Sequence, residues 1–188
     1  MKKIALAVAV SSFAVGALAA PETFNVEPTH TYPRFEYSHF GYSNQQQRFD
    51  KTSGKLVIDR AAKTGSVDVT IDATSVNTGY ALFNQHIQAE DYFHTEKFPS
   101  ISFKSTAVKF DGDKPVAIDG NLTIKGVTKP VTLTVTSFHA MPHPMLKKDA
   151  IGANASAKVK RSEFNMGKNV PYVSDEVTLT IAVEAIKE

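Results

Sequence analysis

The sequence lacks cysteine altogether, in a chain of 188 residues. Disulfides are therefore excluded, and packing alone must hold the fold even in an oxidising compartment. A cysteine nucleophile and a thioether-linked lipid are excluded with them. Two hydrolase patterns, G-x-S-x-G and H-E-x-x-H, are also missing from the sequence. These absences favour a binding protein over an enzyme.

An excess of positive charge is also lacking once the N-terminal segment is set aside. The chain has 21 Lys and Arg against 19 Asp and Glu, and Lys2 and Lys3 account for the difference. Residues 20–188 therefore carry no formal net charge. Such a surface has little to draw it onto phosphate backbones, so nucleic acid is not expected as a partner.

Long apolar runs are scarce, and the one at the N-terminus is too short to span a bilayer stably. Lys2 and Lys3 precede this run, which extends from Ile4 to Leu18, and small residues stand at Ala17 and Ala19. This is the spacing that a signal peptidase reads. We predict a cleaved signal peptide at 1–19 and one periplasmic domain at 20–188 without stable membrane insertion. A retained anchor is the alternative.

Alternation of apolar and polar residues dominates the rest of the chain, most clearly in the stretch 116–135, where Val116, Ile118 and Leu122 are predicted to share the dry face. A period of two indicates strands with one dry and one wet face, because successive side chains leave opposite faces. Gly126 and Pro130 mark a turn in the middle, so this stretch is predicted to be an antiparallel hairpin. Similar alternation recurs at 33–39, 49–59, 65–72, 99–104, 153–160 and 177–183, whereas 41–47 and 137–149 are predicted to be loops.

About eight short antiparallel strands predict an all-β barrel or sandwich, with a short helical segment near 81–90. Eight strands can close into a barrel that holds one small ligand, and closure also removes exposed strand edges. The predicted dry face contains almost no ionisable group. Such an interior either packs solid or encloses an apolar cavity, and the pattern leaves both open.

Several motifs along the chain are typical of one known family. They are His30 with Phe35, HFGYS at 39–43, TSVNT at 74–78, His86, AEDYF at 89–93, KFP at 97–99, FKST at 103–106 and GNLTIKGVTKPV at 120–131. On these motifs the chain resembles the YceI-like family of periplasmic polyisoprenoid-binding proteins over essentially its whole mature length.

The resemblance implies an extended, lipocalin-like eight-stranded antiparallel barrel that carries an aliphatic guest. The implied guest is a long isoprenoid or other aliphatic lipid, such as a ubiquinone-type quinone, a prenyl lipid or a fatty-acid-like amphiphile. Family members often carry Arg and Asp where this chain has Phe83 and Asn84. Phe83 offers no charge to a phosphate-bearing head group.

We expect the lining and mouth of the barrel to bind this guest, with no other cofactor required. The candidate residues are His30, Phe35, Tyr37, His39, Phe40, Leu56, Ile58, Val69, Ile71, Phe83, His86, Ile87, Phe93, Ile101, Phe103, Ile118, Leu122, Leu133, Val135, Phe164, Met166, Leu179 and Ile181. For the three histidines, hydrogen bonds that pin loops are an alternative to contact with a head group.

A second function class rests on the segment 139–145. His139, Met141, His143 and Met145 alternate imidazole and thioether groups, which suit copper. A periplasmic copper-binding protein is therefore the alternative function. A homodimer that joins two barrel mouths is a further arrangement that the sequence leaves open.

Overall fold

A computed structural model describes residues 20–188, so the predicted signal peptide at 1–19 lies outside the described part. The elements are β1 (Glu22–Val26), β2 (Tyr32–His39), β3 (Ser43–Phe49), β4 (Thr52–Asp59), β5 (Thr64–Asp72), η1 (Ala73–Ser75), β6 (Val76–Asn77), α1 (Ala81–His86), β7 (Ser100–Asp111), β8 (Lys114–Ile124), β9 (Val127–Pro142), β10 (Asp149–Lys160), η2 (Arg161–Phe164) and β11 (Glu176–Lys187). Among these residues no helix has the length and hydropathy to cross a membrane.

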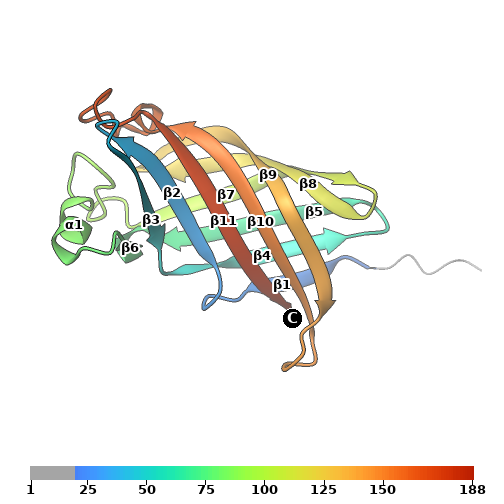
Figure 1. Cartoon of the computed structure of the whole chain (residues 1–188). Helices are drawn as coiled ribbons and strands as arrows, with labels where there is room; N and C mark the ends of the chain where they lie inside the picture. The colour runs from blue at the N-terminus through green and yellow to red at the C-terminus, as the bar shows by residue number, and fades with distance from the viewer. Residues whose placement is uncertain (1–19) are drawn as a thin grey trace, which may run out of the picture.

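The strands form one antiparallel sheet that closes on itself (Figure 1). Its order is β1-β4-β5-β7-β8-β9-β10-β11, and β1 pairs back onto β11 with Val26 opposite Ala185. Eight strands therefore surround the interior, and the predicted closed barrel is confirmed. The short helix predicted near 81–90 is also present, as α1.

Three of the barrel strands break and continue as β2, β3 and β6, which extend the sheet in the order β11-β2-β3-β6. β1 covers the end of β11 near Ala185, and β2 pairs with the same strand further along, at Thr178–Ala182. Thr31 bridges the break, because its hydroxyl donates to the carbonyl of Glu184 and accepts from the Glu184 amide. β1 and β2 thus cover successive parts of β11, and the barrel is longer than either of these strands alone.

Two predicted loops are wrong. Residues 43–49 form β3, because the polar run Gln45–Gln47 pairs residue by residue with β2. β9 continues to Pro142, so His139 and Met141 lie in a strand that pairs with β10. In both places the strand partner outweighs a local sequence that looks like a loop.

Bulges shift the face of several side chains. β7 and β8 change register between Lys109 and Phe110, and Val116 is exposed although it was predicted to lie on the dry face. A bulge moves every later side chain on its strand to the other face. Counting alternate residues from Leu122 back along β8 therefore assigns Val116 to the wrong face of the sheet.

The interior has two groups of buried side chains. The larger group lies toward α1 and contains the edge-to-face pairs that Phe93 makes with Phe35 and Phe49. The smaller group, which we call the plug, closes the other end with Phe24, Ile58, Ile151 and Ala185.

Candidate functional site

The barrel encloses a cavity of about 530 Å³ whose wall is almost entirely apolar. Inward-facing side chains such as Val69, Leu133 and Leu179 are only half-buried, although they point to the inside of a closed sheet. Neighbours in a packed core would exclude such side chains from solvent, so their partial exposure marks unfilled space. The volume falls within the ~300–1,000 Å³ typical of small-molecule sites. Of the two predicted interiors, the barrel has the one with a cavity.

The structure brings together 22 of the 23 candidate residues around this cavity, from Phe35 on β2 to Ile181 on β11. Alternation places most of them, because each contributing strand turns one face inward. His30 is the exception, since it is exposed and lies outside the cavity wall.

Sequence reasoning missed Phe110 and Phe138, which also line the cavity. Both follow irregularities in register, between Ser105 and Ala107 on β7 and opposite Asn154 and Ala155 of β10. A bulge changes which face a residue occupies, and no residue type in these segments announces one. The pairing of the strands was the only signal that could have found these two aromatic residues.

Polar groups of the wall gather toward α1. The Tyr37 hydroxyl lies 3.5 Å from the side-chain amide of Gln47, and burial raises the pKa of Tyr37. His86 lies edge-on to Tyr92, with ring centroids 5.1 Å apart. The Thr52 hydroxyl is buried in the wall and has no hydrogen-bond partner among residues 20–188. Hydrogen-bonding side chains are therefore available to a polar atom of a guest.

Arg161 also borders the cavity, but its guanidinium is committed to the protein. It donates to the carbonyls of Met166, Lys168, Val173 and Ser174. Burial lowers the pKa of Arg161, and the nearby charge of Asp175 opposes that shift. Four bonds to backbone carbonyls make Arg161 the centre that shapes the 166–174 loop.

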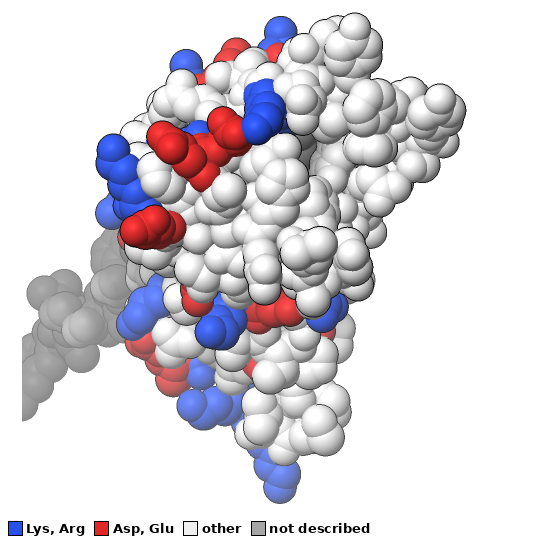
Figure 2. All heavy atoms as spheres, turned by 90° about the vertical axis from the view of Figure 1, so that its left-hand side faces the viewer, with Lys and Arg blue, Asp and Glu red and all other residues white. Residues whose placement is uncertain are grey.

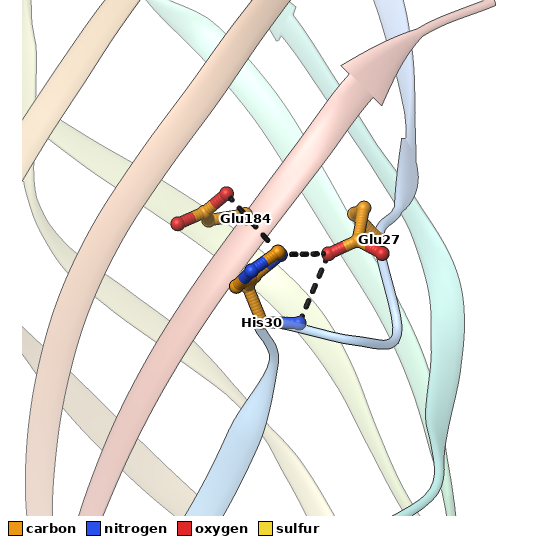
Figure 3. A group of neighbouring side chains, drawn as sticks. All are labelled: Glu27, His30 and Glu184. Carbon is orange, nitrogen blue, oxygen red and sulfur yellow. Dashed lines mark hydrogen bonds and ion pairs between the residues drawn. The ribbon is translucent and has the colours of Figure 1, made fainter.

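One group of side chains among the described residues has the composition of a metal site. Glu27, His30 and Glu184 can each bring one ligand atom to within 4.8 Å of the others (Figure 3). The Glu27 carboxylate, however, already accepts bonds from the amides of Thr29 and His30, from the Thr29 hydroxyl and from Nδ1 of His30. Burial alone would raise the pKa of Glu27, but these bonds outweigh it and lower the pKa to about 2. The group therefore fixes the break between β1 and β2.

The four residues of the copper hypothesis do not all lie in a loop, contrary to the prediction from the sequence. His139 and Met141 are exposed on β9, two residues apart on the outer face of the sheet. Nδ1 of His143 accepts bonds from the amides of Met145 and Leu146, which ties that imidazole to its own hairpin. Copper binding by His139, Met141, His143 and Met145 stays a prediction.

Comparison with known proteins gives consistent matches over most of the chain. A family model described as the YceI-like domain matches residues 24–185. Protein YceI of Escherichia coli O157:H7 is 36% identical over 192 residues, covering 100% of both chains. The crystal structure of Burkholderia cenocepacia BcnA has a TM-score of 0.70 and 26% identity, covering 85% of this chain and 98% of its own.

A solved structure described as a polyisoprenoid binding domain from Saccharophagus degradans has the same fold. It has a TM-score of 0.66 at 17% identity, and the match covers 88% of this chain and 98% of that one. At this identity the likeness concerns the fold alone.

Proposed function

The chain belongs to the YceI-like family, and we propose that it binds one water-insoluble aliphatic molecule inside its barrel. The observation that carries this proposal is the half-buried, apolar wall around the 530 Å³ cavity. Apolar surface facing water is unfavourable, and an aliphatic guest would cover it. The polyisoprenoid named for the Saccharophagus degradans domain agrees with this class of guest.

The guest we propose is a long isoprenoid or other aliphatic lipid, such as a ubiquinone-type quinone, a prenyl lipid or a fatty-acid-like amphiphile. Each buried methylene contributes ~0.8 kcal/mol, so about ten of them supply a gross ~8 kcal/mol. That gain is offset in part by the freedom the guest loses on binding. A tail of this length can therefore be held by the wall without a charged anchor.

The head group of the guest belongs at the α1 end in this proposal. Tyr37 and His86 offer hydrogen-bonding groups there, and both border the cavity. The guanidinium of Arg161 already donates to four backbone carbonyls. An uncharged carbonyl or hydroxyl head fits these groups better than a phosphate does.

Filling the cavity tests the proposal against a neighbour on the other face of the same strand. Leu133 points into the cavity, whereas Thr134 is exposed on the outside of β9. Leu133→Trp should weaken binding of a long-chain quinone analogue at least about tenfold, because the indole takes the space of the tail. Thr134→Trp should bind like the wild type. Equal binding by both variants, with the fold intact by circular dichroism, would contradict the proposal.

We propose the periplasm as the location, on the strength of the signal peptide predicted at 1–19. Protein from an osmotic-shock fraction should begin at or near Ala20 by N-terminal sequencing. A chain that begins at Met1 would instead support the retained anchor.

A further inference from the structure

We propose that the α1 end of the barrel docks on the surface of a lipid bilayer through an aromatic rim formed by Phe40, Tyr42, Val170 and Tyr172. This inference rests on the proposed function, because a water-insoluble guest has to be collected from or delivered to a bilayer. The aromatic rim comes from two loops, 40–42 between β2 and β3, and 168–173 before β11.

The rim is exposed at a cost to the folded chain. Tyr42 is 90% exposed, Tyr172 69% and Phe40 51%. Phe40 and Gly41 have φ values of 53° and 73°, the signs of a type I′ turn. Asn or Gly is favoured at the first of these positions, and a bulky aromatic residue is an outlier there. Folding favours neither the exposure nor the strain of Phe40, so a role at the surface accounts for both.

The two loops hold the rim in one arrangement. The rings of Phe40 and Tyr172 stack with centroids 6.1 Å apart, and the Phe40 amide donates to the Tyr172 carbonyl at 2.7 Å. His39 and Val173 form a β-bridge beside them. Arg161 binds the carbonyls of Lys168 and Val173 from below. A preformed surface loses little conformational freedom when it docks.

The rim is continuous with the cavity. Phe40, Asn169 and Val173 of these loops line the cavity, and Phe83 of α1 lines it too. A hydrocarbon chain that leaves a bilayer under this rim would therefore reach the cavity past Phe40 and Val173. Tyr42 and Tyr172 lie outside the cavity wall, so they touch the bilayer but not the guest.

The charge of the rim favours an apolar contact rather than attraction to anionic lipids. Its two loops contain one charged side chain, Lys168, which pairs with Asp91. Figure 2 looks onto this end of the barrel and shows a broad uncharged area, with most Lys, Arg, Asp and Glu side chains to its left and below. Aromatic side chains, Tyr in particular, favour the interface between lipid and water.

A bilayer fits the shape of the rim better than a second copy of the chain does. Both loops project from the barrel as narrow tips beside α1 (Figure 1). Stable protein interfaces bury roughly 1,200–2,000 Å², which asks for a broad, complementary face. Projecting aromatic tips instead enter a soft interface with little area and no fixed partner shape.

A hairpin elsewhere in the chain provides a matched control. Met145 and Leu146, between β9 and β10, are 82% and 54% exposed, and Lys147 and Lys148 follow them. This hairpin combines apolar and basic side chains but has no aromatic residue, and none of 141–148 borders the cavity. If it were the docking site, binding would depend on anionic lipid and on salt.

The experiment measures co-sedimentation of the mature protein with phosphatidylcholine vesicles, with and without added phosphatidylglycerol. Tyr42→Ser/Tyr172→Ser should lower the vesicle-bound fraction about tenfold, because two interfacial rings are lost. Met145→Ser/Leu146→Ser should stay within about twofold of the wild type, a small change for side chains outside the rim. Wild-type binding should change little with phosphatidylglycerol or salt.

Several other results of this experiment would overturn the proposal. Wild-type levels of binding by the tyrosine variant, loss in the Met145/Leu146 variant alone, or no co-sedimentation of the wild type would overturn it. A change in sedimentation-equilibrium mass of the tyrosine variant, with unchanged vesicle binding, would assign the rim to a second copy. A detergent-solubilised quinone analogue separates this failure from that of the proposed function, since the tyrosine variant should bind it normally.

A spectroscopic readout checks the depth of the rim. The chain has no tryptophan, so Tyr42→Trp introduces a single reporter at the most exposed position. Its emission should shift to the blue on addition of phosphatidylcholine vesicles, and brominated lipid should quench it. An emission maximum that vesicles do not move would contradict docking at this end.

Discussion

The plug and the cavity wall are built from the same kinds of side chain on the same strands, yet they differ in what fills the space between them. Phe24 and Ala185 of the plug are fully buried, because neighbours from the chain itself surround them. Val69 and Leu179 of the wall are half-buried beside the cavity. Residue chemistry alone does not separate a core from a binding site. Partial exposure of inward-facing side chains marks the unfilled space, although buried side chains such as Phe103 and Leu122 line the cavity as well.

The largest change in the free energy of unfolding is expected when a side chain of the plug is truncated. Phe24→Ala should lower the free energy of unfolding by about 3–5 kcal/mol, because the ring leaves a void in a packed region. Ile181→Ala, in the wall, should cost about 1 kcal/mol or less, since part of that side chain faces an existing cavity. Urea denaturation measures both.

Guest affinity should rank these two variants in the opposite order. Ile181→Ala should weaken binding of a long-chain quinone analogue, whereas Phe24→Ala should bind like the wild type at a temperature where it is folded. Equal costs in stability for the two variants would remove the distinction between plug and wall.

A smaller loss of stability is expected at Gly120, where the ring of Phe103 packs closely against the backbone. A Cβ at Gly120 would lie 2.4 Å from Cζ of Phe103 and 2.7 Å from the Lys104 carbonyl oxygen. Gly120→Ala should therefore cost about 1–3 kcal/mol, because the ring and the neighbouring strand must move. Gly152→Ala is the control, since no atom lies within 4 Å of its added Cβ. If the two alanine variants unfold at the same urea concentration, the close packing of Phe103 over Gly120 is contradicted.

The smallest effect concerns pH at the break between β1 and β2. Hydrogen bonds lower the pKa of Glu27 from its ordinary 4.5 to about 2. A group with a lowered pKa in the folded state stabilises the protein above its unfolded pKa and loses that contribution as pH falls. Stability from Glu27 should therefore decline between about pH 4.5 and pH 2. Glu27→Gln should flatten this part of the stability profile, and an unchanged slope would contradict the role of the carboxylate.

Much of the fold could be predicted because alternation reports directly on which face a side chain occupies. The hairpin around Gly126 and the inward residues Leu122 and Leu133 follow from that period alone. β3 could not be predicted in this way, because Gln45–Gln47 is polar and its strand depends on pairing with β2.

Many residues that line the cavity were predictable from the sequence, but the volume of the cavity was not. Whether an eight-stranded barrel packs solid depends on how its strands tilt and on how far its side chains reach across, which no single strand reveals. Phe110 and Phe138 were missed because bulges set their faces. His30 was placed at the mouth on the strength of a motif, whereas it bonds to Glu27 on the exterior.

Native mass spectrometry of the protein purified without detergent asks whether the barrel holds a guest. We expect a mass above that of the mature polypeptide, with the excess removed by organic extraction and restored by a long-chain quinone analogue. A mass equal to the polypeptide before and after extraction, with no uptake of the analogue, would contradict it.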